Sequence, residues 1–542
     1  MKKLALLCCL FCLVEFASGN NIQVANVSLT GQVAASDYTF VQFDLSWDNA
    51  FRLAAGPGNW DGAWVFVKYQ ITGGAGCTAS TAWNHASLST VDAEHSIGGN
   101  LSIINAVSDG RGVFISRSDI ASGTVNWTSL QLRWNYGLDG VLDACTATIK
   151  VFAVEMVYVP TGSFYVGDGN AANGRFEDGV SGNPFQVTSA ITPATLGGGG
   201  AGSMGNNNAA GMTGGADEFN DATTRVLAAT WPNGYSKFYC MKYEISQEQY
   251  AEFLNTLTGT QQSARHPALV AGSYFGNAAG IVSPASRNGI KCKIAPVGAT
   301  PGEYVCDLDN DGIFNETSGD GRFLACDWMS STDVMAYLDW SGLRPMTEME
   351  YEKACRGSLL AVNGEYAWGT AAFTAAAAIS NSGSDNELVT TASANTAFNN
   401  SFAAGPLRTG IFATGTSTRV QAGATYYGIM EMTGNVWEDD VSLGSTAGRS
   451  FTGLHGNGAL TAAGTANVDF WPGINGNNTN GNPNLAFGGV TGSTGYAGMG
   501  FMGGSFNGGT WGQISQREYR NNWTGINGRD VRNGGRGVRT AP

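Results

Sequence analysis

The first quarter of the chain alternates between hydrophobic and polar residues, as half-buried β-strands do. Between residues 41 and 48 the hydrophobic positions are Val41, Phe43, Leu45 and Trp47, and the residues between them are polar. The same alternation occurs over residues 130–136 and 149–153, with Gly-, Asn- and Asp-containing turns in between. Several such strands without a convincing helical period predict an antiparallel β-sandwich over residues 20–153.

After about residue 154 short helices enter the pattern. Ser246 is placed to cap a helix that carries Tyr250, Phe253 and Leu254 at helical spacing. A second helix is expected over residues 332–340, opened by Ser331. For a third, Thr347 and Glu350 have the spacing of a capping box, and Gly357 stands in the C-terminal stop position.

A Gly- and Asn-rich stretch interrupts this region at about residues 169–220. It includes four consecutive glycines, Gly197 to Gly200, and shows no hydrophobic period. We therefore expect an inserted surface loop with little regular structure.

The first 19 residues have the layout of an export signal. Lys2 and Lys3 precede an apolar run over residues 4–14, and small residues at 17–19 offer a cleavage site. No later stretch approaches the roughly 20 consecutive apolar residues that a transmembrane helix needs. The sequence thus predicts a signal peptide over residues 1–19, no transmembrane segment, and a secreted or cell-surface protein.

Composition narrows the possible partners. The chain has 542 residues, 13% of them charged, and a net charge of −14. An acidic protein repels nucleic-acid phosphates, so no nucleic-acid partner is expected. The 77 glycines and 14 tryptophans fit tight turns between aromatic-rich strands rather than long helices.

Seven of the ten cysteines follow the signal, an odd number. In an oxidising compartment we expect disulfides and one leftover thiol. Two pairs are preferred: Cys77 with Cys145, the two cysteines of the N-terminal region, and Cys292 with Cys306, which would close a short loop.

A series of segments in the second part of the chain resembles the formylglycine-generating enzyme, or sulfatase-modifying factor, family. The segments are 156–167, 238–246, 343–357 (Leu-Arg-Pro-Met-Thr-Glu-Met-Glu-Tyr-Glu-Lys-Ala-Cys-Arg-Gly), 366–369, 428–438, 503–506 and 535–539. They stand in the family's order. The resemblance implies a loop-rich α+β domain of C-type-lectin-like fold with few short helices over residues 154–542.

The resemblance also locates the family's copper-binding cysteine pair, shortly after the Gly-Gly-Ser segment. The two positions fall on Gly508 and Gln513, and Cys355 is the last cysteine of the chain. Copper(I) needs soft thiolate ligands, so neither copper nor the parent chemistry is expected. Relatives with a three-histidine iron site need histidines on this domain, which holds only His266 and His455. No catalytic residues are assigned.

Calcium is the expected cofactor, on two grounds. The family's calcium loop maps onto Glu431, Gly434, Val436 and Glu438, and Asn395 and Thr396 match part of a second family site. Independently of the resemblance, Asp307, Asp309 and Asp311 alternate before Gly312 and Ile313, as in the first half of a Ca²⁺ loop. A solvated acidic turn is the alternative for the second loop, because Ser318 stands where such a loop has its bidentate Glu.

The C-terminal stretch offers residues suited to ligand recognition: Ser505, Trp511, Gln513, Arg517, Tyr519 and Arg520. Aromatic faces combined with amides and guanidinium groups are typical of binding surfaces. The alternative is that the arginines make hydrogen bonds inside the fold.

Two classes of function remain open from the sequence. The first is an exported, non-catalytic family member, stabilised by calcium, that acts in binding or assembly at the cell surface, with a surface glycan, a protein or further copies of itself as partner. The alternative is a divergent enzyme of the same family, a protein-modifying oxidoreductase with an unidentified active site.

Overall fold

The computed structural model describes residues 21–170, 172–213, 215–266, 270–276, 280–399, 402–472, 498–508, 511–520 and 528–542. The expected signal peptide lies outside the described residues. No helix in the described part of the chain has both the length and the apolar character needed to cross a membrane.

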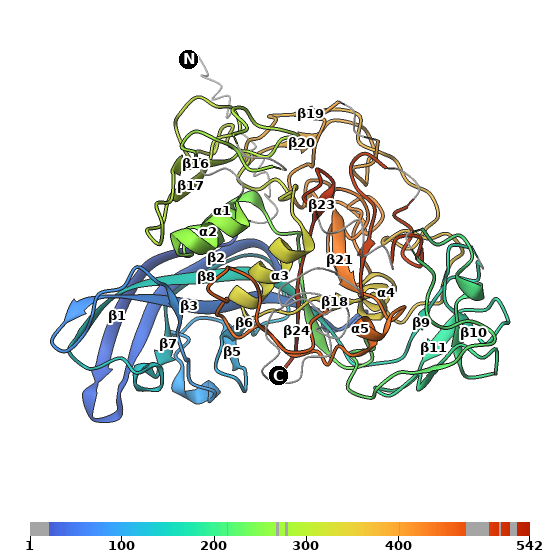
Figure 1. The fold of residues 1–542 in the computed structure, drawn as a ribbon, viewed down its shortest axis with the longest axis horizontal. Coiled ribbons are helices and arrows are strands. Elements are labelled where there is room, and N and C mark those ends of the chain that lie inside the picture. Colours follow the sequence, from blue (N-terminus) through green and yellow to red (C-terminus); the bar gives the residue numbers. More distant parts are fainter. Residues whose placement is uncertain are drawn as a thin grey trace, which may run out of the picture.

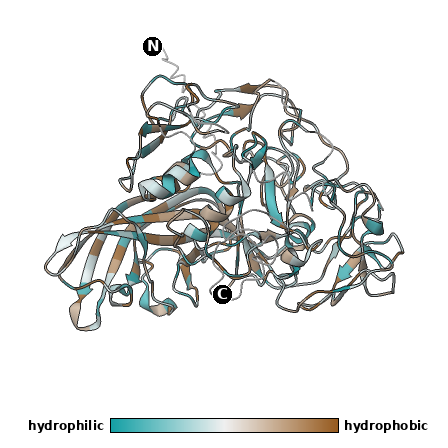
Figure 2. Ribbon diagram, viewed as in Figure 1, coloured by the Kyte–Doolittle hydropathy of each residue, from teal (hydrophilic) through white to brown (hydrophobic). Residues whose placement is uncertain are grey.

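Two antiparallel sheets form the predicted sandwich. One has the order β1-β2-β7, and the other has the order β24-β15-β8-β3-β6-β5 with β4 beside β3. The strands are β1 (Gln23–Val33), β2 (Tyr38–Phe51), β3 (Asp61–Gly74), β4 (Asn84–His85), β5 (Ser102–Ala106), β6 (Val113–Arg117), β7 (Ser122–Trp134), β8 (Cys145–Val159), β15 (Phe238–Met241) and β24 (Val538–Thr540). Val41, Phe43, Leu45 and Trp47 all point into the core between the sheets, which confirms the predicted alternation. The hydrophobic strands of the sandwich are visible in Figure 2.

The larger sheet is not confined to the sandwich. β8 runs through residue 154, pairs with β3 on one side and pairs with β15 on the other. β3 is buried on both faces: Val65 and Val67 face the sandwich core, whereas Trp64 and Phe66 face the core of the lectin-like part. The helices α1 (Gln247–Leu254) and α3 (Ser331–Trp340) lie beside β8 (Figure 1). A single sheet thus belongs to both parts of the molecule.

The lectin-like part is rich in loops, with short helices and strands between them. Its helices are α1, α2 (Gly259–Arg265), α3, α4 (Glu348–Arg356) and α5 (Thr446–Arg449). Its further strands are β16 (Ile290–Ile294), β17 (Glu303–Cys306), β18 (Met346–Thr347), β19 (Ile379–Ser380), β20 (Leu388–Val389), β21 (Trp437–Val441), β22 (Met499–Met502) and β23 (Asn533–Gly534). The short 3₁₀ helices of the chain are Ala34–Ser36, Asp92–Glu94, Tyr136–Asp139 and Asn207–Ala209. The α+β class is confirmed.

The predicted helix caps are present. Ser246 caps α1, and Thr347 and Glu350 form a capping box on α4, which ends at Gly357 with φ of 66°. α3 begins one residue earlier than expected, because Ser330 and not Ser331 accepts the hydrogen bond of the cap. A hydroxyl at either position would serve, so the sequence alone left this choice open.

The stretch at 169–220 has little regular structure, as expected, but it is not only a surface loop, because part of it packs into the core. β11 (Phe185–Val187) pairs with β9 (Phe164–Val166), and β10 (Glu177–Asp178), β12 (Thr195–Leu196), β13 (Met204–Gly205) and β14 (Arg225–Val226) form a small sheet. Its hydrophobic side chains are buried in the main core: Phe176, Phe185, Leu196, Met204 and Phe219. A few widely spaced hydrophobic residues therefore anchor this insertion.

The disulfide between Cys77 and Cys145 is confirmed, with 5.5 Å between the Cα atoms. The pair Cys292–Cys306 is wrong, because both thiols are free. In the β16–β17 hairpin Cys292 lies opposite Tyr304, and Cys306 lies opposite Ile290. The two cysteines therefore occupy different rungs of the ladder.

Candidate functional site

The two positions of the family's cysteine pair lie beside a tryptophan in this fold. A Cβ atom on Gly508 would approach the ring of Trp511 to 2.6 Å, closer than side chains pack. Gln513 accepts a hydrogen bond from the guanidinium of Arg175. The space that a cysteine would need at 508 is thus taken by an aromatic ring, and the second position holds an amide with its own partner.

Trp511 belongs to a group of three rings, the aromatic cluster Trp437, Trp511 and Tyr519. The ring centroids of Trp511 and Tyr519 are 5.8 Å apart, and each lies within 6.3 Å of Trp437. Trp437 is buried, whereas Trp511 and Tyr519 are only partly buried. The buried ring packs against two others that keep part of their surface exposed to solvent.

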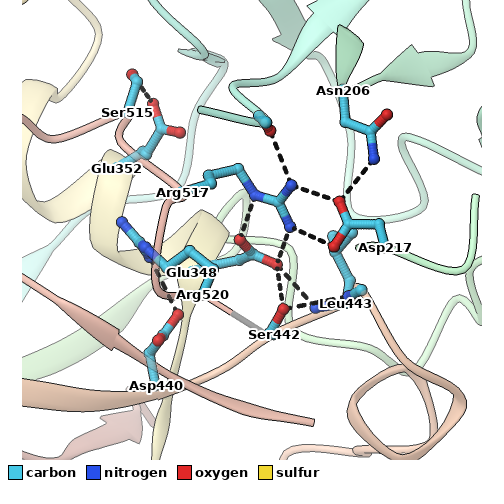
Figure 3. A network of polar contacts seen from close by, with 12 residues as sticks. Asn206, Asp217, Glu348, Glu352, Asp440, Ser442, Leu443, Ser515, Arg517 and Arg520 are labelled. Carbon is cyan, nitrogen blue, oxygen red and sulfur yellow. Dashed lines mark hydrogen bonds and ion pairs between the residues drawn. The ribbon is translucent and has the colours of Figure 1, made fainter. Parts of the chain in front are cut away.

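Arg517, by contrast, is fully committed to the fold (Figure 3). Its guanidinium lies between Glu348, at 2.8 Å, and Asp217, at 2.5 Å, and it is buried. Burial opposes the positive charge, but the two carboxylates raise the pKa of Arg517 above its usual value. Asp217 comes from the insertion and Glu348 begins α4, so this arginine holds three distant segments together.

Arg520 and Ser505 also point inward. Arg520 pairs with Asp440 at 3.1 Å and is buried, as Figure 3 shows. The hydroxyl of Ser505 is buried and donates to the side chain of Asn507 at 3.1 Å. Of the six residues predicted for ligand binding, only Trp511, Gln513 and Tyr519 retain exposed surface.

The residues matched to the family's calcium loop already have partners. Arg536 donates to both oxygens of Glu438 at 2.7 Å, and Glu431 accepts from the amide of Gly410. Burial raises the pKa of Glu431 to about 7. The amides of Gly434 and Val436 donate to the carbonyl of Gly503 and to Glu244. The guanidinium of Arg536 thus lies beside Glu438, while the ligand atoms expected at Gly434 and Val436 are main-chain carbonyls, so calcium binding at this loop stays a prediction.

Asn395 and Thr396 are likewise engaged within the protein. The Asn395 amide accepts from Thr374 and donates to the carbonyl of Val420, and the Thr396 hydroxyl donates to the carbonyl of Thr433. Their side chains link loops of the lectin-like part.

The second predicted loop, Asp307 to Ile313, follows β17 directly. Asp307, Asp309 and Asp311 have carboxylate oxygens that all lie within 4.8 Å of one another. Lys291 pairs with Asp307 at 2.5 Å. The structure thus brings these three predicted ligands together.

The remaining chemistry-bearing residues of the described chain are mostly buried. Among the described residues the five free cysteines are buried, and burial raises the pKa of Cys240 to about 12. His266 packs against Phe275 and Tyr304, and His455 accepts from the amide of Thr540. Thiols with raised pKa are poor nucleophiles at neutral pH.

Sequence reasoning missed the partners of Arg517. Glu348 sits in the first turn of a predicted helix, where an acidic residue is expected to serve the helix N-terminus and to face solvent. Asp217 lies in a stretch taken for a surface loop. The one available signal was the number of arginines in the tail of an acidic chain, which need counter-charges when buried.

Comparison with known proteins supports this fold. A family model described as the sulfatase-modifying factor enzyme 1-like domain matches residues 198–541, more than half of the chain. The chain therefore belongs to the sulfatase-modifying factor family. No curated protein matches it.

Proposed function

We propose that this chain is an exported, non-catalytic member of the family that binds a carbohydrate at the cell surface through the aromatic cluster. The observation that carries the proposal is the contact between Gly508 and Trp511. Where the family's catalytic relatives hold a thiolate, this chain holds a tryptophan ring.

The chemistry of the cluster supports a sugar ligand. Partly exposed aromatic rings can stack on the apolar C–H face of a sugar, while neighbouring polar groups bind its hydroxyls. Gln516 is hydrogen-bonded to Glu518 at 2.9 Å, next to Tyr519 in the chain. An amide and a carboxylate thus accompany the aromatic rings.

A glycan array probed with the mature protein tests this proposal. Trp511→Ala and Tyr519→Ala should each reduce binding at least tenfold while the melting temperature changes by only a few degrees. Trp83→Ala is the matched control, because Trp83 is also partly buried but lies in the sandwich. Binding that survives both cluster variants would contradict the proposal, as would binding to protein ligands alone.

Self-association is a second candidate, favoured by the strand β1. β1 ends its sheet, is 11 residues long, and contains neither a charged residue nor a proline. Val27 and Leu29 on it are 38% and 41% exposed. Edge strands that lack charged residues and prolines pair more readily with another chain, and between the two irregularities of β1 at 25–28 and 30–33, residues 28–30 form a regular edge. Light scattering should then show a dimer that Leu29→Lys converts to a monomer and that Leu138→Lys, on an exposed turn, leaves intact.

A further inference from the structure

The loop after β17, residues 307–313, has the backbone shape as well as the sequence of a calcium loop. Gly312, the sixth residue, has φ of 86°, and its amide donates to Asp307 at 3.4 Å. The amide of Ile313 donates to Asp311 at 2.7 Å. A glycine at the sixth position makes the sharp turn by which such loops direct alternate carboxylates to one point.

A fourth carboxylate reaches this loop from farther along the chain. Asp320 is fully buried, and its Oδ1 atom has no hydrogen-bond partner. Its Oδ2 atom accepts from the amide of Glu316 at 2.6 Å. A buried carboxylate oxygen without a hydrogen-bond partner destabilises the fold. This oxygen therefore calls for a donor or a cation beside it.

Asp320 directly follows a residue that packs against the loop. The neighbouring Gly319 packs so closely on Asp309 that no Cβ atom would fit between them. The carboxylates of Asp309, Asp307 and Glu316 are close enough to that of Asp320 to repel it electrostatically. Like charges that face one another across a short distance need a cation.

The positively charged side chains near the loop do not balance its carboxylates. Lys291 pairs with Asp307 and also donates to the side chain of Asn310 at 2.9 Å. Arg322, the next cation, is engaged by Glu248 and Asp385. Among the described residues, the ammonium of Lys291 pairs with Asp307, and Asp309, Asp311, Glu316 and Asp320 form no ion pair.

We propose that residues 307–320 form a calcium site, with the carboxylates of Asp307, Asp309 and Asp311 and the carbonyl of Ile313 as ligands, closed by Asp320. Asp320 takes the role that a glutamate at the twelfth position has in related loops. Four carboxylates, one carbonyl and water supply the six to eight oxygen ligands that Ca²⁺ requires. Because Asp320 is outside the group of three that lies within 4.8 Å, binding draws residues 316–320 toward the loop. The site is independent of the sugar ligand.

Calorimetric titration of the mature full chain with Ca²⁺ is the direct test. Extracellular calcium modules bind with Kd of about 10⁻⁴ to 10⁻³ M. Asp309→Asn and Asp320→Asn should each weaken binding at least tenfold, and Lys291→Met should strengthen it because a competing charge is removed. Asp119→Asn, at an acid paired with Arg117 on the sandwich, should leave it unchanged.

Terbium luminescence supplies a second measurement. The hydroxyl of Tyr274 lies 2.7 Å from the side-chain oxygen of Asn310 and 3.0 Å from the backbone carbonyl of Asp307, within hydrogen-bonding distance of both, so an aromatic ring stands beside the site. Tb³⁺ emission excited through tyrosine should appear and be displaced by Ca²⁺. The proposal is overturned if neither titration shows binding, if Asp309→Asn binds like the parent, or if Glu438→Gln abolishes binding instead. Unchanged binding by Asp320→Asn would overturn the closing role of that residue.

Discussion

The ammonium of Lys242, in the lectin-like part, lies 2.7 Å from the carboxylate of Asp61, in the sandwich. Glu155 on β8 lies 3.2 Å away on another side of the same ammonium. All three side chains are buried. A buried ion pair is favourable only when its charged groups keep their short distances and hydrogen bonds. This cluster therefore fixes the sandwich and the lectin-like part relative to each other.

Removing the shared cation should destabilise the whole chain. Lys242→Met leaves two buried carboxylates without their cation, and we expect the free energy of unfolding to fall by about 3 to 5 kcal/mol. Lys150→Met, which breaks an exposed pair with Glu252, should cost no more than about 1 kcal/mol. Calorimetry should show one transition for the parent chain, and two separate transitions would contradict a shared sheet and interface.

Glu155 should make stability depend on pH. Burial raises its pKa from 4.5 to about 7, although the neighbouring Lys242 opposes this change. The pKa of Glu155 is higher in the folded state than in the unfolded state. Its contribution to the free energy of unfolding is therefore fully present below about pH 4.5 and is lost as the pH rises through 7.

For a pKa shift of this size at Glu155, the free energy of unfolding should fall by about 3 kcal/mol between pH 4.5 and 7.5. Glu155→Gln cannot ionise, so its urea-unfolding free energy should vary less over this range than that of the parent. Glu252→Gln, at a partly exposed residue, is the control. Equal pH dependence in Glu155→Gln and the parent would show that Glu155 has an ordinary pKa.

Arg517 should be required for the insertion to stay folded. Arg517→Met leaves Glu348 and Asp217 buried without their cation, and we expect a loss of about 3 to 5 kcal/mol. Protease cleavage within residues 169–220 should become faster. Arg225→Met, at a half-exposed ion pair with Glu218, should leave cleavage unchanged. If Arg517→Met were as stable as the parent, the ion pairs would contribute little to the fold.

The predictable part of the fold is the part with a regular period. The alternation at 41–47 and the cap residues Ser246 and Thr347 depend on neighbours in the sequence, so they could be recognised without the structure. The insertion could not be, since Phe176, Phe185 and Leu196 are separated by about ten residues and are buried through distant contacts. Periodicity carries no information about such contacts.

The candidate site divides in the same way. Asp307, Asp309 and Asp311 lie on one local turn, where spacing determines geometry, and the structure brings them together. Arg517 and Arg520 look like ligand-binding residues by type, but their partners Asp217 and Asp440 are far away in the chain. Whether a polar residue faces a ligand or the interior depends on those partners.

The free thiols should be unreactive in the folded protein. Cys240, Cys292, Cys306, Cys326 and Cys355 are buried, and burial raises the pKa of each. We expect the thiol reagent DTNB to label none of the five within minutes under native conditions and all of them in urea. Rapid labelling of one thiol in the native protein would favour the divergent enzyme.

The most direct test of the non-catalytic assignment is a modification assay on a cysteine-containing peptide derived from a sulfatase. The purified mature protein, supplied with copper, oxygen and a reducing thiol, should leave the peptide mass unchanged, because a tryptophan ring and an amide replace the two thiolates. Conversion of the peptide cysteine to formylglycine, seen by mass spectrometry and absent with heat-treated protein, would contradict the account.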